Sequence, residues 1–441
     1  MARESDGWAY RELGSVDLGD ERRNERAKAL LTRLAENPTA SIPQACRGWA
    51  ETMGAYRFVE NPAVDWREIL QPHWDCTRER MREHAVVLCL SDTTGLDFNG
   101  QNISGLGPLN YEAQRGMYLH PTYAVSTDRV GLGVLDAWMW AREFKDAEGK
   151  RGGIKESMRW IEGYERTAEL APELPGTRLV YVADRESDIT ALMQRAEELG
   201  TPVDWLIRST HDRSLDDGEK LWPKVFKTEA VGEIQFVMAA REGQKARTVK
   251  QALYMKRVTL RCGLVVTCVI AREIDPPAGV KPVEWRLLTN RIPAGRDDLV
   301  ELIDWYRARW EIEMFFHVLK NGCRVESLQL ATVDRIERAL ALFMIVAWRI
   351  AYLMRMGRTC PDLDAALFFD PDEIHGAYLL MRKRMPKGVP KLNEVLRLIA
   401  QLGGFLARKG DGEPGAKTIW EGLQHVMTSA ETLRALRCEA A

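Results

Sequence analysis

The stretch YRARWEIEMFFHVLK (Tyr306–Lys320) combines a few charged residues with many large apolar ones. On a helix that turns by about 100° per residue, Tyr306, Arg309, Glu313 and Lys320 fall within roughly 60° of one another. The remaining directions carry mainly Trp, Ile, Met, Phe, Val and Leu, a pattern typical of a buried helix. An acid flanked by two cations on such a helix could bind a metal ion and phosphate groups.

Two more carboxylates stand at the ends of apolar, strand-like runs. Asp92 ends LCLSD and Asp184 ends VYVAD. Ligand sites in α/β sheets favour the carboxyl ends of strands. Clustered carboxylates repel one another unless a hard divalent cation lies between them. Together with Glu313, these acids predict a magnesium site, in which a pair of ions about 4 Å apart would act on a phosphodiester.

Simpler interpretations of these acids remain open at this point. An Asp at a strand end is often a turn residue or a helix cap. Asp188, one helical turn beyond Asp184, could be the ligand in its place. Glu313 could form the usual i, i+4 ion pair with Arg309. The stripe of polar residues formed by Tyr306, Arg309, Glu313 and Lys320 would then be a polar contact between domains.

The composition is that of an ordinary globular protein of several domains. The chain has 441 residues, of which 45% are hydrophobic and 29% charged. We see no apolar run near the ~20 residues of a membrane span, and the charged N-terminal segment lacks the apolar core of a secretory signal, so we expect a cytoplasmic protein. The eight cysteines are scattered, which predicts neither disulfides nor structural zinc.

The net charge of −2 argues against general binding to polyanions, but the charge is uneven. The segments Arg241–Arg257 and Arg382–Lys391 are strongly basic. Basic segments on a near-neutral chain fit a protein that touches nucleic acid with selected faces, although two solvated surfaces would look the same.

The order of predicted elements indicates a mixed α/β core. Helical patterns fill the first 80 residues, with helix ends predicted at Asn37-Pro38 and Asn61-Pro62. Strands alternate with helices to about residue 209, short β-rich pieces follow, and the helix that carries Glu313 is predicted at about 297–321. The predicted domains are a helical one at 1–78, a core in two parts at 79–209 and 291–360, a β-rich insertion at 210–290 and a helical region at 361–441.

Several motifs in this order match a known family. The spacing Y-(2)-R-(3)-E-(6)-K follows two blocks, DTTG at Asp92 and VADRESDI at Asp184. Shorter matches are LGDERRNERA, GAYRFVENP, PPAGVKPVEWRLLT, LGGF and WEG. With these motifs, the chain resembles the cut-and-paste DDE transposases of bacterial insertion sequences, of the transposon-five kind.

The resemblance implies an RNase H-like catalytic core with a β-rich insertion, flanked by helical N-terminal and C-terminal domains. The N-terminal domain would bind the terminal inverted repeats of the element, and the C-terminal region would dimerise. The implied partners are therefore double-stranded DNA, both transposon ends and target, and a second copy of the chain on that DNA, with no role for a membrane.

The resemblance also implies a chemistry. Asp92, Asp184 and Glu313 would be catalytic and would hold two Mg²⁺ ions, for which Mn²⁺ could substitute. The ends would be cleaved through a hairpin intermediate, and the 3′ ends would be joined to target DNA. Trp285, with Trp310 as its companion, would receive a flipped base.

The other implied DNA contacts are mostly basic. They are Tyr306, Arg309, Lys320, Arg22, Arg23, Arg26, Arg57, Arg185, Arg208 and His317. The chain departs from its relatives at His317, where a lysine is found, which would make a phosphate contact there weaker or dependent on pH.

Other interpretations compete with these roles. Trp285 could be a core residue of the insertion, and the N-terminal arginines could be a solvated face paired with neighbouring acids. One rival function is a catalytically silent protein that occupies DNA ends, against which the intact triad and stripe argue. Another is an RNase H-like nuclease without strand transfer, which would have no need of Trp285.

Overall fold

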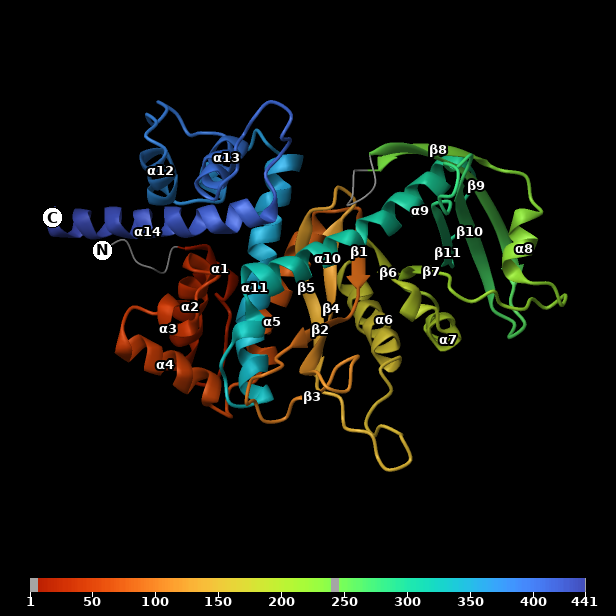
Figure 1. Ribbon diagram of the computed structural model, residues 1–441, viewed down its shortest axis with the longest axis horizontal. Coiled ribbons are helices and arrows are strands. Elements are labelled where there is room, and N and C mark those ends of the chain that lie inside the picture. The colour runs from red at the N-terminus through yellow and green to blue at the C-terminus, as the bar shows by residue number, and fades with distance from the viewer. Residues whose placement is uncertain (1–6, 239–245, 441) are drawn as a thin grey trace. The chain divides into compact units, whose positions relative to one another are not determined.

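The structure is a computed structural model that describes residues 7–238 and 246–440. Residues 239–245, which include the start of the basic segment Arg241–Arg257, lie outside the described residues. The chain divides into two compact units (Figure 1). The first unit comprises Met1–Arg80, Thr93–Gly153 and Glu311–Ala441, and the second comprises Met81–Asp92 and Ile154–Trp310.

The first unit is mainly helical. Its helices are α1 (Trp8–Glu12), α2 (Glu21–Glu36), α3 (Ile42–Ala45), α4 (Trp49–Glu60), α5 (Trp66–Arg82), α10 (Trp310–His317), α11 (Val333–Thr359), α12 (Pro371–Leu380), α13 (Leu392–Leu402) and α14 (Ala416–Ala440), with short turns η4 (Val318–Gly322), η5 (Val325–Ser327) and η6 (Ala365–Leu367). Its strands β2 (Thr94–Asp97), β3 (Gly107–Pro108) and β5 (Gly131–Trp140) all pair antiparallel with β4 (Arg115–Ser126).

Local sequence signals set the ends of the N-terminal helices. The Asp20 side chain accepts a hydrogen bond from the backbone of Arg22 and so caps α2. Helices α2 and α4 end at Asn37 and Asn61, each directly before a proline, as predicted. Apolar residues spaced along α2, such as Leu30, Leu31 and Leu34, are buried.

Helix α11 forms the core of the first unit and packs against α2, α4, β5, α13 and α14. Its length and apolar composition would suffice to cross a membrane. The expectation that the chain contains no apolar run of this length was therefore wrong. Within the protein, however, 78% of its most apolar window is buried, as in the core helix of a soluble protein.

The second unit is built on one sheet. Its strands are β1 (Val86–Ser91), β6 (Arg178–Ala183), β7 (Asp204–Arg208), β8 (Gly232–Met238), β9 (Arg247–Thr259), β10 (Val265–Glu273) and β11 (Glu284–Thr289). Its helices are α6 (Met158–Leu170), α7 (Thr190–Glu198), α8 (Leu221–Phe226) and α9 (Arg296–Ala308), with turns η2 (Ala171–Glu173) and η3 (Arg185–Ser187).

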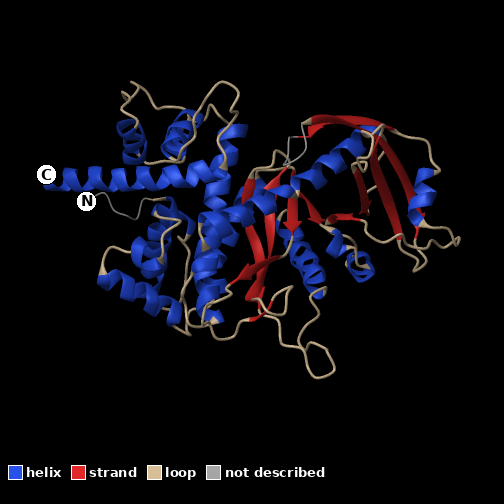
Figure 2. Cartoon of the chain, viewed as in Figure 1, coloured by secondary structure: helices blue, strands red, loops and turns tan. Residues whose placement is uncertain are grey.

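The sheet changes from parallel to antiparallel along its width. Strands β1, β6 and β7 are parallel, and β11, β10, β9 and β8 continue from β7 in antiparallel pairs (Figure 2). The β-rich insertion therefore extends the sheet of the core strands. The predicted fold class is confirmed: the protein is mixed α/β, with helical N-terminal and C-terminal parts.

The predicted helix over residues 297–321 is wrong as a single regular element. Helix α9 ends at Ala308, α10 starts at Trp310, and a π-helical turn covers Val318–Gly322. A π turn closes hydrogen bonds from i to i+5, so residues within it rotate by less than the 100° assumed for the stripe. Sequence spacing alone therefore does not place Lys320 on one face with Tyr306.

Candidate active site

The two aspartates of the second unit stand side by side because of the strand register. Strands β1 and β6 are parallel neighbours, and their last pair is Ser91 with Ala183. Asp92 and Asp184 are the residues directly after that pair. Adjacent strands lie about 4.8 Å apart, so two carboxylates leave neighbouring strand ends at the same level.

Asp92 is buried and paired with a cation. Only 9% of Asp92 is exposed, and its carboxylate accepts a hydrogen bond from the guanidinium of Arg309. The two side chains are 12% and 14% exposed. Arg309 follows the last residue of α9 and reaches a strand that lies 217 residues earlier in the chain.

Further polar side chains surround the aspartates. Tyr306 on α9 is buried, and this burial raises the pKa of its phenol. Arg309 and Arg208, which is at the end of β7, oppose this rise in the pKa of Tyr306, while Asp184 adds to it. Two acids, two cations and a phenol therefore gather at one edge of the sheet.

Asp188 is used for structure. It is 3% exposed, and its carboxylate accepts hydrogen bonds from the backbone of Thr210 at 2.7 Å and His211 at 3.0 Å, and also from Arg213. These contacts fix the segment after β7. Among the bonds found in the described residues, the carboxylate of Asp184 accepts only a capping hydrogen bond, from the backbone of Glu186 at 2.8 Å.

Glu313 and Lys320 belong to the first unit. Glu313 lies in the first turn of α10 and is half-buried. Lys320 is 3.4 Å from Glu326, which also accepts a hydrogen bond from the backbone of Asp97 at 2.9 Å. Lys320 thus has an acidic partner in addition to any phosphate that it would contact.

Trp285 on β11 is half-buried and stacks on another ring. Its centroid lies 5.5 Å from that of Phe236 on β8, with an interplanar angle of 19°. The guanidinium of Arg307 lies 5.0 Å from the Phe236 centroid and 6.0 Å from that of Trp285. Sequence reasoning missed Phe236 and Arg307, because no spacing rule links β8, β11 and α9.

The remaining predicted DNA contacts are spread over the surface. Trp310 is 60% exposed, which leaves its ring accessible for stacking. Arg57, Arg185, Arg208 and His317 are exposed.

The arginines of α2 differ from one another. The Arg22 side chain is 91% exposed and lies 3.0 Å from Asp20, where it holds the pKa of that carboxyl at about 2. Arg23 donates to the backbone oxygen of Leu18 at 2.8 Å. Arg26 packs over Gly54 on α4, where a Cβ would be 2.7 Å from the Arg26 guanidinium.

The donor chemistry of this edge suits magnesium. Among residues 7–238 and 246–440, no three Asp, Glu, His or Cys side chains form a group that could hold a metal ion. Mg²⁺ is commonly held by one or two carboxylates, with waters and substrate phosphates completing its shell. Asp92 and Asp184 at neighbouring strand ends supply two such oxygen ligands.

Three family models match the chain in sequence. Residues 5–64 match the model described as transposase DNA-binding, residues 161–349 match the transposase DDE domain, and residues 345–440 match the transposase Tn5 dimerisation domain. Among solved structures, a chain from a cryo-EM structure of the piggyBac transposase synaptic complex with hairpin DNA is similar over 92% of this chain and 79% of that one. Its sequence identity is 9% and its TM-score 0.39, which is too low to support a conclusion.

The protein is a DDE transposase, an enzyme that cleaves DNA and transfers its strands. It belongs with the insertion-sequence transposases that resemble the Tn5 transposase, since DNA-binding, DDE and Tn5-type dimerisation segments follow one another along the chain. A DDE domain works with divalent metal ions.

Proposed function

We propose that this transposase excises its element by cutting at the terminal inverted repeats and then joins the 3′ ends to target DNA, with Asp92, Asp184 and Glu313 as the catalytic acids. The observation that carries this proposal is the edge of the second unit, where Asp92 and Asp184 leave adjacent strand ends beside Arg309. The alternative in which Asp188 replaces Asp184 is disfavoured by its three hydrogen bonds within the protein.

The three acids would hold two Mg²⁺ ions. When bound, such ions activate the attacking oxygen and stabilise the leaving oxygen of a phosphodiester. Arg309 would bind a DNA phosphate through its fork of N–H groups, since arginine recognises phosphate in a bidentate manner. Tyr306 and Lys320 would contact neighbouring phosphates. Because Arg309 is paired with Asp92, its transfer to a phosphate would free that carboxylate for metal.

Excision through a hairpin would require an unstacked base near the transposon end. Trp285 would receive that base, with Trp310 as its companion. A flipped base needs an aromatic face, and stacking contributes about 1–3 kcal/mol per base. The half-buried Trp285 ring already has Phe236 on one side, so the base would stack at the remaining exposed part of this pair.

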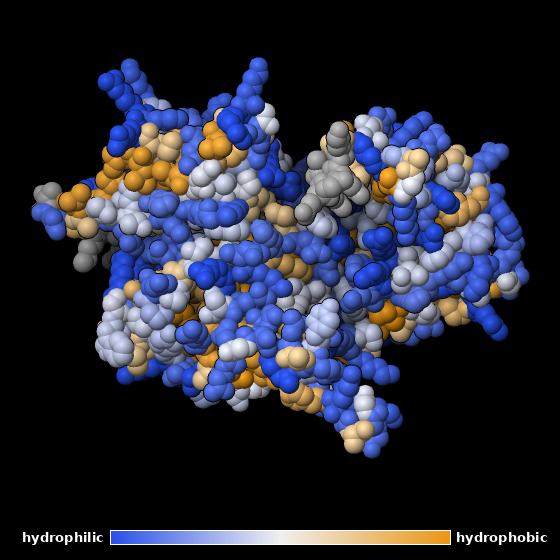
Figure 3. Space-filling view, in the orientation of Figure 1, coloured by the Kyte–Doolittle hydropathy of each residue, from blue (hydrophilic) through white to orange (hydrophobic). Residues whose placement is uncertain are grey.

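Two chains would hold the two ends in a synaptic dimer. The segment that matches the dimerisation family carries exposed apolar side chains, including Leu379 and Leu380 at the end of α12, which are 52% and 41% exposed. Figure 3 shows apolar side chains gathered over this part of the first unit. The N-terminal arginines would contact the inverted repeats, and we infer that the protein works in the cytoplasm, where its DNA lies.

The test is a cleavage assay with purified protein, Mg²⁺ and a labelled DNA end from the sequence flanking the gene, resolved on a denaturing gel. We expect a hairpin product from the wild type and none from Asp92→Asn or Glu313→Gln, which should still bind the end. Glu186→Gln, an exposed carboxylate two residues after Asp184, is the matched control and should cleave normally.

Other outcomes of this assay would decide against the proposal. Normal cleavage by Glu313→Gln would show that Glu313 is not catalytic and would favour its interpretation as an ion-pair partner of Arg309. End binding without cleavage by the wild type, in Mn²⁺ as well as Mg²⁺, would support the silent end-binding protein. Cleavage without any hairpin in the wild type would remove the base-receiving role of Trp285.

A further inference from the structure

The first unit contains a cavity whose lining includes none of the proposed catalytic or DNA-contacting residues. It has a volume of about 180 Å³ and lies where α1, α5 and α11 meet the segment around η6. At roughly 30 Å³ per water molecule, this volume accommodates about six waters or a tetrahedral anion with some of them. Three guanidinium groups and one carboxylate line it, from Arg11, Arg80, Arg349 and Glu12.

The single acid of the cavity is already neutralised. Glu12 receives two hydrogen bonds from Arg80, at 3.1 and 3.0 Å, and is hydrogen-bonded to Nδ1 of His73 at 2.5 Å. These contacts hold the pKa of Glu12 at about 2 in spite of its burial. Arg80 and Glu12 therefore compensate each other, and Arg349 is the cation of the cavity that core helix α11 supplies.

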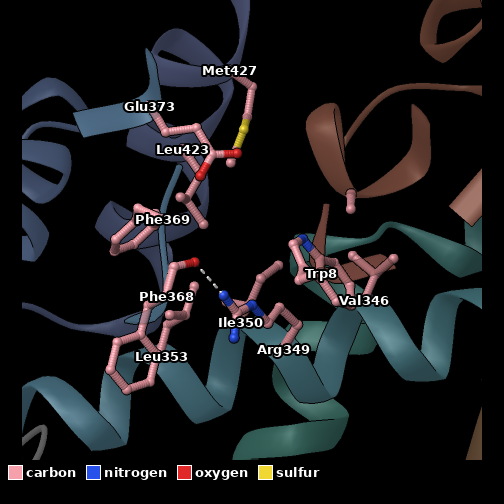
Figure 4. Close-up of a pocket in the computed structure, with 11 residues that line it drawn as sticks. Trp8, Val346, Arg349, Ile350, Leu353, Phe368, Phe369, Glu373, Leu423 and Met427 are labelled. Atoms are coloured by element: carbon pink, nitrogen blue, oxygen red, sulfur yellow. Dashed lines mark hydrogen bonds between the residues drawn. The ribbon is translucent and has the colours of Figure 1, made fainter. Parts of the chain in front are cut away.

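The guanidinium of Arg349, a half-buried residue, has few hydrogen-bond partners within the described residues. Its guanidinium donates to the backbone oxygen of Phe368 at 2.6 Å, the bond drawn in Figure 4. It lies 5.2 Å from the ring centroid of Trp8 and 6.0 Å from that of Tyr352. Over the described part of the chain it forms no salt bridge. Burial lowers the pKa of Arg349 to about 10, so it remains charged at neutral pH.

An acid on the other side, Glu373, interacts favourably with Arg349 but compensates its charge only in part. Glu373 lines the adjoining cavity of about 20 Å³ together with Arg349 (Figure 4). Burial and the nearby Asp370 raise the pKa of Glu373 to about 7, so it is only partly ionised near neutral pH. A half-buried guanidinium beside a partly protonated acid is a suitable partner for an anion, and an anionic ligand would complete its counter-charge.

We propose that this cavity binds a small free anion of the phosphate class, such as phosphate or pyrophosphate, with Arg349 as its main ligand. Guanidinium groups suit phosphate oxygens, and the rings of Trp8, Trp348 and Tyr352 line the same cavity. Arg11 lies exposed, where it would contact the outward side of the anion. The phenol of Tyr352 has no hydrogen bond in the described residues and would donate to it. The bound anion would join α1 to α11 and so stabilise the first unit.

The test is binding of pyrophosphate to the full-length protein without Mg²⁺. Binding is measured by calorimetry and by the change in the thermal unfolding midpoint Tm, and chloride at equal ionic strength is the reference. We expect saturable binding and a rise in Tm for the wild type, and loss of both in Arg349→Met. Arg358→Met is the matched control, since Arg358 on the same helix also donates to one backbone oxygen, that of Pro414 at 2.7 Å. An equal response from Arg349→Met and the wild type would overturn the proposal.

Exposed Leu367 at the cavity provides a second test that does not disturb the core. Leu367 is 65% exposed, so substitutions there should leave folding intact. We expect Leu367→Glu to weaken pyrophosphate binding at least tenfold and Leu367→Lys to tighten it. Identical affinities of the two variants would contradict the proposal. Displacement of pyrophosphate by a short DNA duplex would also contradict it, because the occupant would then be a phosphate of the DNA backbone. Asp92→Asn should bind pyrophosphate normally, which separates this site from the catalytic one.

Discussion

At the scale of single residues, the pairing of Arg309 with Asp92 is the main ionic contact found at the proposed catalytic edge. Both side chains are largely buried, so each compensates the charge of the other. In the proposed mechanism, Arg309 would have two alternative partners, the Asp92 carboxylate in the free protein and a phosphate in the DNA complex. It also means that a cation would compete with Arg309 for Asp92.

Replacement of Arg309 by Met should separate these roles. Without its guanidinium, Asp92 lacks its cation, so we expect Mg²⁺ alone to raise the Tm of Arg309→Met more than that of the wild type. Cleavage of the DNA end should fall by about 100-fold, since a positioned donor at a reacting phosphate contributes this much. Arg307→Met, which removes a neighbouring cation on the same helix, is the control for the Mg²⁺ effect. A smaller Mg²⁺-induced rise in Tm for Arg309→Met would contradict this account.

At the scale of elements, helices α2 and α14 of the first unit meet through two carboxyl groups. Glu36 of α2 is 8% exposed, and burial together with its neighbour Glu431 of α14 raises the pKa of Glu36 to about 7. Arg33, 3.0 Å from Glu36, and Arg47, at 3.7 Å, oppose this rise. Arg47 also pairs with Glu431. The contact therefore favours a protonated Glu36.

This contact predicts a loss of stability as the pH rises. The folded protein binds the Glu36 proton more tightly than the unfolded chain, whose pKa is near 4.5, so the free energy of unfolding falls between pH 4.5 and about 7. Glu337 and Glu373, with pKa values raised to about 7, act in the same direction. We expect Tm to drop by a few degrees from pH 5 to 8, and to drop less in Glu36→Gln. An unchanged slope in that variant would show that Glu36 is not responsible.

At the scale of the whole molecule, the proposed function requires two copies of the chain. The described residues of the first unit leave the apolar end of α12 uncovered, because Leu379 and Leu380 are exposed while Tyr378 beside them is buried. Exposed leucines next to each other on a helix end are a suitable contact for a second copy, since their burial removes apolar area from water.

Charged residues at this position should prevent pairing of DNA ends. We expect Leu379→Asp with Leu380→Asp to bind one DNA end normally but to form complexes with two ends at least tenfold less, measured by sedimentation and native gels. Val265→Asp, an equally exposed apolar position of the β-rich insertion, is the control and should pair ends normally. Unchanged pairing in the double variant would place the dimer contact elsewhere.

The sequence by itself determined the elements and the residue types of the site. Apolar runs with an acid at the end predicted β1 and β6, and Asn-Pro pairs predicted the ends of α2 and α4, because these signals are local. The spacing from Tyr306 to Lys320 predicted the family, which the DDE match confirms. The irregular backbone within this stretch could not be predicted, since helical periodicity assumes a constant rotation per residue.

Only the tertiary structure decided which side chains meet. Strand register brings Asp92 beside Asp184, and Arg309 reaches Asp92 across 217 residues. The same packing assigns Asp188 to hydrogen bonds with the backbone and stacks Phe236 on Trp285. Arg349 would have counted as a routine polar residue of an apolar helix. Its place in the cavity depends on neighbours that come from distant parts of the sequence, namely α1, α5 and the segment around η6. Local sequence patterns do not predict such neighbours.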